Sequence, residues 1–153
     1  MKRGFSFPEL LMVMGIIAIL STFMVTNLLN TQRKVNIDTS VSKIVGDFKH
    51  QQLKSMMRDT DGQTTSDYYG VYFEPTRYTL FRGSSYSAGN TSNFVVDLDG
   101  AQLSSIGQVE IIFASGSGEI NGFGNNQKTI TIFQGTAQKI ITINKFGVVT
   151  NIN

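Results

Sequence analysis

One carboxylate, that of Glu9, stands at the beginning of a long apolar segment and has the clearest chemical consequence in the sequence. From Leu10 to Leu29 there is no charged residue, and the polar side chains are limited to Ser, Thr and Asn. About 20 apolar residues in a helix span the ~30 Å hydrocarbon core of a bilayer. A carboxylate at the edge of such a segment is costly, so it predicts a functional site with a positively charged partner.

A short leader before this segment supplies the partner. Met1–Gly4 holds two basic residues and ends in glycine. If the chain is cut after Gly4, Phe5 carries a new α-ammonium group, and Glu9 follows about one helical turn later. The ammonium group and the carboxylate can then pair, within one chain or between two, so that neither charge is buried alone.

These residues resemble the class III signal of type IV pilins and of the pseudopilins of type II secretion. The resemblance rests on the Gly4–Phe5 junction, on Glu9 and on the charge-free apolar run that follows. It implies that a prepilin peptidase removes Met1–Gly4, that the Phe5 amine is methylated, and that Glu9 directs assembly. Pro8 stands where the family more often has an aliphatic residue, and it favours a helix that begins nearer Pro8 than Phe5.

The apolar segment is expected to form a transmembrane helix that also packs against the same helix of other subunits. The residues predicted to make this packing are Leu10, Leu11, Val13, Gly15, Ile16, Ile17, Ile19 and Leu20. Two simpler interpretations remain. A cleaved secretory signal peptide usually has a shorter apolar core and an A-x-A-like cleavage site, which does not follow here. A plain uncleaved anchor explains neither Glu9 nor the Gly4–Phe5 junction.

Composition leaves room for one modest domain besides this segment, since the chain has 153 residues. Cys is absent, which excludes disulfides and thiolate metal sites, and the formal net charge is +2. Without Lys2 and Arg3 the chain holds 11 basic and 11 acidic residues. A near-neutral mature chain does not favour a broad basic surface for nucleic acid.

Apolar residues continue at helical spacing after the first segment. Between Asn30 and Arg58 no proline occurs, and Gly46 is the one glycine. We therefore expect one continuous helix over residues 8–58, which ends at the turn Asp59–Gly62. The apolar face of its second half is predicted to hold Ile37, Val41, Ile44, Val45, Phe48, Leu53 and Met56. The polar face is predicted to hold Lys43, Asp47, His50, Lys54 and Arg58.

The sequence after Gly62 predicts about seven β-strands, because apolar and polar residues alternate between Gly-rich turns. The strands are expected at 70–74, 77–81, 94–98, 108–114, 128–134, 138–144 and 147–152. The expected fold class is α+β, with a long N-terminal helix packed on an antiparallel β-sandwich-like domain. The helix is expected to be transmembrane in its first half and amphipathic in its second. The expected divisions are the leader 1–4, the transmembrane and assembly helix 5–30, the amphipathic half 31–58 and the β domain 63–153.

The β part is similar to H-type pseudopilins and their minor-pilin relatives. Gly70–Phe81 resembles their first hairpin, and Lys128–Val149 resembles their last strands. The resemblance implies a minor subunit, near the tip or in initiation, of a type II secretion pseudopilus or type IV pilus; a major pilin is the alternative. The implied partners are other pilin or pseudopilin subunits, the prepilin peptidase and the inner membrane. The chain would cross that membrane once, with its β domain in the periplasm or outside the cell.

No other residues predict a catalytic or metal site. His50 is the only histidine, which excludes a pair of His ligands, and it is interpreted as a solvated helix residue. Asp59 and Asp97 each begin an Asp-x-Asp-Gly sequence, but neither continues to the glutamate of a calcium loop, so both are interpreted as turns. No enzymatic activity, cofactor or small-molecule substrate is expected.

A DNA-binding minor pilin for natural transformation is the alternative function. Some minor pilins of this kind bind DNA through arginines in a C-terminal Gly-Arg-x-Arg segment. Gly147–Thr150 is the corresponding stretch here and contains no arginine. Since phosphate contact requires cations, DNA binding is not favoured.

Overall fold

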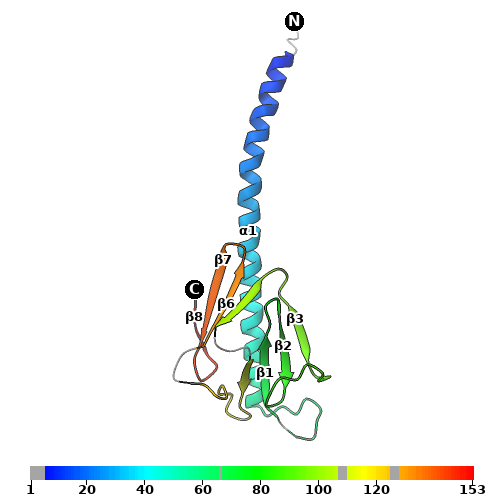
Figure 1. Ribbon diagram of the computed structural model, residues 1–153, viewed down its shortest axis with the longest axis vertical. Helices are drawn as coiled ribbons and strands as arrows, with labels where there is room; N and C mark the ends of the chain where they lie inside the picture. Colours follow the sequence, from blue (N-terminus) through cyan, green and yellow to red (C-terminus); the bar gives the residue numbers. More distant parts are fainter. Residues whose placement is uncertain (1–5, 66, 107–109, 125–127) are drawn as a thin grey trace. The chain divides into compact units, whose positions relative to one another are not determined.

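The computed structural model describes residues 6–65, 67–106, 110–124 and 128–153. In these ranges the chain forms one helix, α1 (Phe7–Met56), followed by eight strands (Figure 1). The strands are β1 (Tyr69–Phe73), β2 (Arg77–Arg82), β3 (Phe94–Asp97), β4 (Gln102–Ile106), β5 (Glu110–Phe113), β6 (Lys128–Gln134), β7 (Ala137–Ile143) and β8 (Val149–Ile152).

The chain divides into two compact units, Met1–Val35 and Asn36–Asn153. The second unit contains all the strands and the part of α1 that follows Val35. In the first unit, the described side chains of α1 are those up to Thr22.

The second part of α1 buries one stripe of side chains. Ile37, Val41, Ile44 and Phe48 are buried, as the spacing predicts. The same spacing continues from Phe48 to Gln51 and Ser55, which are buried polar residues.

The prediction that Leu53 and Met56 belong to the buried face is wrong. Their exposed fractions are 52% and 49%, because the helical period places Gln51 and Ser55 on the inner side instead. Ser55 is satisfied there, since its Oγ donates a hydrogen bond of 2.9 Å to the backbone oxygen of Phe113. The last turns of the helix are therefore attached to β5 by a polar contact rather than an apolar one.

A Schellman motif ends α1. The N–H of Asp59 donates to the carbonyl of Lys54 at 2.9 Å, and the N–H of Arg58 donates to the carbonyl of Ser55 at 3.2 Å. Arg58 occupies the left-handed position of this motif with a φ of 52°. Glycine is the usual residue there, so the sequence carried no clear stop signal at this point and the predicted end lay two residues later.

The strands form two antiparallel sheets of four strands each, in the orders β3-β2-β1-β5 and β4-β6-β7-β8. The predicted hairpin around Pro75–Thr76 is confirmed, because β1 pairs with β2 and Phe73 lies opposite Tyr78. The prediction for β6, residues 128–134, is also confirmed. β8 begins at Val149 rather than at residue 147, because Gly147 has a φ of 71° and belongs to the turn after β7.

The strand count of about seven is too low, since the described ranges contain eight strands. β4 is the strand without a counterpart in the prediction. Its sequence, Gln-Leu-Ser-Ser-Ile, alternates poorly, and only pairing with β6 over Gln102–Ile106 makes it a strand. Strand propensity is a weak signal where tertiary pairing decides.

Residues of α1 and of both sheets share one hydrophobic cluster. Its members include Phe48 of α1, Tyr78 and Phe113 of the first sheet, and Ile132 and Ile141 of the second. All members lie between Ile37 and Ile143. The described core is therefore contained in the second unit.

The fold class expected from the sequence has to be corrected. Within the part of the chain that the structure describes, no helix is long and apolar enough to cross a membrane. This finding contradicts the transmembrane helix predicted over 5–30, the single-pass topology and the inner-membrane location.

The expected packing of a long helix on a β domain is also corrected. Only Asn36–Met56 belongs to the unit of the strands, and the residues up to Val35 form a unit of their own. The part of α1 in the second unit contributes to the same core as both sheets. The helix is thus divided between two units, and its second part is an internal component of the β unit.

Candidate functional site

The residues predicted to pack against other subunits are exposed on the first unit. For the predicted residues with large side chains, the exposed fraction lies between 44% and 63%. Met12 and Met14 lie among them and are exposed as well. Because successive helical residues point about 100° apart, the run from Leu10 to Met14 makes every side of the helix apolar. Such a helix is normally buried.

Glu9 lies in the first turn of α1 and contacts Ser6. Glu9 Oε2 accepts the backbone N–H of Ser6 at 3.4 Å and the Ser6 hydroxyl at 3.5 Å. This is the return contact of a capping box, in which Glu at the third helical position reaches back to the capping residue. Among the described residues, Glu9 has no basic partner.

The predicted cleavage and methylation residues, Gly4 and Phe5, lie outside the described residues, so the pairing of the Phe5 amine with Glu9 stays a prediction. Gly15 is described, and a Cβ atom placed on it would meet nothing within 4 Å.

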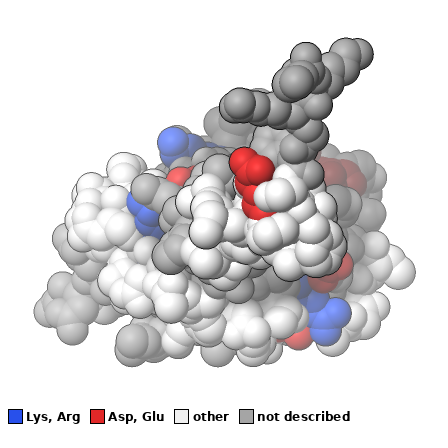
Figure 2. All heavy atoms as spheres, turned by 90° about the horizontal axis from the view of Figure 1, so that it is seen from above, with Lys and Arg blue, Asp and Glu red and all other residues white. Residues whose placement is uncertain are grey.

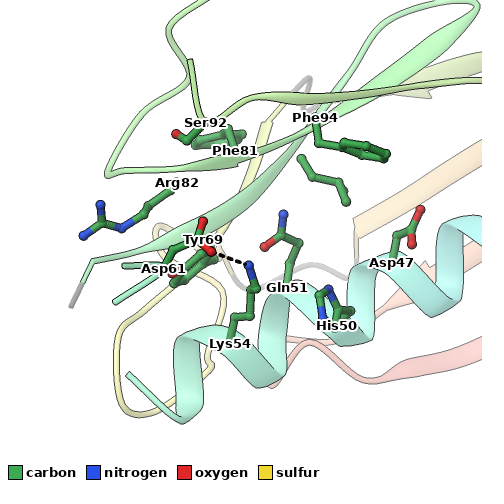
Figure 3. A pocket seen from close by; sticks show the side chains of 11 residues that line it. Asp47, His50, Gln51, Lys54, Asp61, Tyr69, Phe81, Arg82, Ser92 and Phe94 are labelled. Carbon is green, nitrogen blue, oxygen red and sulfur yellow. Dashed lines mark hydrogen bonds and ion pairs between the residues drawn. The ribbon is translucent and has the colours of Figure 1, made fainter. Parts of the chain in front are cut away.

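A second candidate site is a cleft of about 380 Å³ in the second unit, between α1 and the strands β1, β2 and β3 (Figure 3). From α1, Asp47, His50, Gln51 and Lys54 face the strands across it. The opposite side carries mostly aromatic side chains together with Leu80, Ser92 and Arg82. The residues on this side are Tyr69, Leu80, Phe81, Arg82, Ser92 and Phe94, and Asp61 lies in the segment that follows α1.

Internal contacts hold most of the polar groups around this cleft. Lys54 Nζ lies 3.2 Å from Asp61 Oδ1, and the Tyr78 hydroxyl donates to Asp47 Oδ2 at 2.5 Å. Burial raises the pKa of Tyr78 strongly, and the hydrogen bond to Asp47 raises it further. Burial also raises the pKa of Tyr69, with a further contribution from nearby carboxylates. Both tyrosines therefore stay protonated as donors well above neutral pH.

Two groups that line the cleft are exceptions, Gln51 and Arg82, since Gln51 Oε1 and Arg82 Nε are buried and have no hydrogen-bond partner in the described part of the chain. The exposed fraction of Gln51 is 5%. Buried acceptors are normally paired, so an unpaired one at a cleft indicates a place for a ligand donor.

Several basic residues in the described ranges make contacts within the chain. On the face that Figure 2 shows, the coloured Lys and Arg atoms of the described residues lie in separate places, some of them beside Asp or Glu. The contacts within the chain join Lys54 with Asp61, Arg77 with Glu74, Lys139 with Asp38, and Arg82 with the carbonyl of Thr65. In the described ranges, no group of three or more His, Cys, Asp or Glu side chains is placed to hold a metal ion.

Three residues of these sites, Ser6, Gln51 and Phe94, are not among those predicted from the sequence. The spacing Ser-x-x-Glu over Ser6–Glu9 is a capping-box signature and was available in the sequence. Gln51 was identifiable in part, because it lies three residues after Phe48 on the buried stripe. Phe94 carried no signal, because its exposure depends on which strand lies beside β3.

In comparisons with protein-family models, with curated proteins and with solved structures, none matched this chain.

Proposed function

We propose that this chain is a structural subunit of a type II secretion pseudopilus or type IV pilus, cut after Gly4 by a prepilin peptidase and assembled through its N-terminal helix. One observation carries the proposal: the surface from Leu10 to Leu20 is apolar and exposed, and the single carboxylate of Glu9 stands at its head. A helix that is apolar on every side is normally buried against other apolar surface. The same segment of other copies of the chain offers such a surface.

Apolar contact provides the driving force in this proposal. Full burial of a Leu or Ile side chain stabilises by about 1.5–3 kcal/mol, and each copy offers several such side chains on this surface.

Glu9 provides the register between copies. In an assembled filament, the Glu9 carboxylate faces the new amine of Phe5 on a neighbouring subunit. A shifted neighbour leaves both charges unpaired among apolar side chains, at a cost of several kcal/mol. Apolar packing alone has little preference for one register, so the charge pair selects it.

The resemblance of Gly70–Phe81 and Lys128–Val149 to H-type pseudopilins supports a minor subunit that acts in protein secretion, at the tip or in initiation. A minor subunit is present in few copies for each filament. Quantitative immunoblotting of isolated filaments against a co-purified major subunit measures this ratio, and a ratio near one would contradict the minor role.

Mass spectrometry of the protein isolated from its own cells tests the processing step. The expected N-terminus is Phe5, with the mass of Met1–Gly4 removed and one methyl group added. A chain that still begins with Met1 would contradict the proposal.

Substitution of Glu9 tests the assembly step. Glu9→Gln keeps an acceptor for the Ser6 N–H but removes the charge, so we expect normal cleavage and at least about a tenfold loss of incorporation into filaments. Ser6→Ala is the matched control, because it changes the cap and keeps the charge; its incorporation should stay within about twofold of the native chain. If Glu9→Gln is incorporated normally, Glu9 does not set the register.

A further inference from the structure

Phe94 lies on the core face of its sheet but is not covered. Leu80 stands opposite Phe94 on one side and opposite Val71 on the other, and Val71 stands opposite Ile111. Residues directly opposite one another on neighbouring strands point to the same face. Val71, Leu80 and Ile111 are buried, whereas Phe94 is 65% exposed. The last side chain of this inward-facing row, Phe94 on β3, is therefore exposed to solvent.

The free edge of β3 adjoins this aromatic side chain. β3 is the last strand of its sheet, with β2 as its neighbour among the described strands (Figure 1). Phe94 and Val95 are exposed on it. Exposed edge strands are commonly protected by Lys, Pro or a bulge, because their free N–H and C=O groups can pair with another chain. The sequence Phe-Val-Val-Asp offers no lysine or proline.

Gln51 lies across the cleft from this edge and needs a donor. Its carboxamide extends from α1 toward the strands (Figure 3), and its Oε1 is buried without a partner in the residues described. A side chain that enters the cleft past Phe94 and carries a donor at its tip satisfies this oxygen.

The charges that line the cleft favour an uncharged occupant. Two carboxylates, Asp47 and Asp61, are balanced by Lys54 and Arg82. The Lys54–Asp61 pair, at 3.2 Å, is already formed within the chain. A strongly charged ligand would therefore meet side chains of like charge as well as side chains of opposite charge.

We propose that this cleft binds an extended, uncharged peptide segment of another protein, which pairs with the free edge of β3 and inserts one anchor side chain between Phe94 and Gln51. The anchor has an apolar body, which packs on Phe94 and Leu80, and a donor at its tip, which bonds Gln51 Oε1. Tyrosine has this chemistry. Main-chain pairing supplies affinity and the anchor supplies specificity, as in other strand additions to sheet edges. The proposal concerns the second unit alone and does not depend on assembly through the N-terminal helix.

The test uses a blocked, fluorescein-labelled peptide with the sequence Val-Thr-Tyr-Thr-Val, titrated with the full chain and followed by fluorescence anisotropy. Alternation places its two valines and its tyrosine on one face of the added strand. We expect saturable binding with a Kd below about 1 mM. Replacing the tyrosine of the peptide by phenylalanine removes the donor and should weaken binding about threefold to tenfold.

Two variants of the chain assign the contacts. Gln51→Leu removes the acceptor, so it should lose the preference for the tyrosine peptide and bind the phenylalanine peptide at least as well. Phe94→Ala should weaken both peptides, and because Phe94 is exposed this variant keeps the core. The absence of saturable binding to the native chain, an unchanged tyrosine preference in Gln51→Leu, or unchanged binding in Phe94→Ala overturns the proposal.

Discussion

In the single chain, before any assembly, the carboxylate of Glu9 caps the N-terminus of α1. Its Oε2 lies 3.4 Å from the N–H of Ser6, and the negative charge stands at the end of the helix where the macrodipole favours it. Under the proposed function, the amine created at Phe5 competes for the same carboxylate. Capping and register are therefore separable only by a variant that removes the charge and keeps the acceptor, which is the reason for choosing Glu9→Gln.

At Gln51, we expect one substitution to raise the stability of the chain and to remove its preference for the tyrosine peptide. Its Oε1 is buried without a partner, and such a group costs about 1–3 kcal/mol. Gln51→Leu replaces it by an apolar side chain of similar size, so we expect the free energy of unfolding to rise by about 1–2 kcal/mol. Urea unfolding followed by circular dichroism measures this change.

Phe48→Ala is the control for the Gln51 prediction. It lies on the same stripe, and it should lower the free energy of unfolding by about 3–5 kcal/mol, since it leaves a cavity in the core. A destabilised Gln51→Leu variant would indicate that the carboxamide makes a stabilising contact after all.

The end of α1 and the turn after β7 show how elements are joined by polar contacts. Gln52 Nε2 donates to the carbonyls of Gly118 and Phe146, at 3.0 Å and 2.5 Å, so one side chain of the helix holds two loops. Gly147 lies beside the carboxamide of Gln52 that makes these two hydrogen bonds. A Cβ atom on Gly147 would lie 2.5 Å from Gln52 Nε2 and 2.8 Å from a ring carbon of Phe113.

Gly147→Ala should therefore destabilise the second unit. Its φ of 71° is unfavourable for alanine, and the added methyl group displaces Gln52 from its two acceptors. We expect a loss of about 1–3 kcal/mol in the free energy of unfolding, measured by thermal or urea denaturation. Gly89→Ala is the matched control, since its Cβ would meet nothing within 4 Å and its φ is ordinary. Equal stability of the two variants would contradict this account.

At the scale of the whole molecule, the second unit is held together by one core to which α1 and both sheets contribute. The two sheets are not linked by a shared strand, so contacts with the helix are part of what joins them. One such contact is polar: Tyr78 of β2 donates to Asp47 of α1. The stability of the unit therefore includes a titratable contact between helix and sheet.

Stability is expected to fall in alkaline solution. The folded chain keeps the phenol proton of Tyr78 because burial and Asp47 raise its pKa, whereas the unfolded chain loses that proton near its ordinary pKa of about 10. The stabilisation is complete below about pH 10 and decreases as the pH rises above it. Urea unfolding between about pH 8 and about pH 11 measures the slope.

Tyr78→Phe is the control for this pH dependence. It removes the titrating group, so the alkaline slope should become shallower; Tyr69, whose pKa is also raised, accounts for part of what remains. The variant should also be less stable at neutral pH, by about 1–2 kcal/mol, because Asp47 loses its donor. An unchanged slope would show that Tyr78 does not titrate with unfolding.

The sequence by itself determined the features that depend on local pattern. The three-to-four spacing from Ile37 to Phe48 identified the buried stripe of α1, and strict alternation identified β6. The hairpin of β1 and β2 followed from Pro75–Thr76 between two alternating runs. These features need only neighbours in the chain, and so the residue order contains them.

Only the tertiary structure decided which apolar side chains are exposed to solvent and which buried polar atoms have no hydrogen-bond partner. β4 is a strand because β6 lies beside it, and Phe94 is exposed because no described strand lies beyond β3. Gln51 falls on the inner face, where the strands come close enough to bury it and yet leave its oxygen unpaired. Burial and pairing depend on residues far away in the chain, and local spacing carries no information about them.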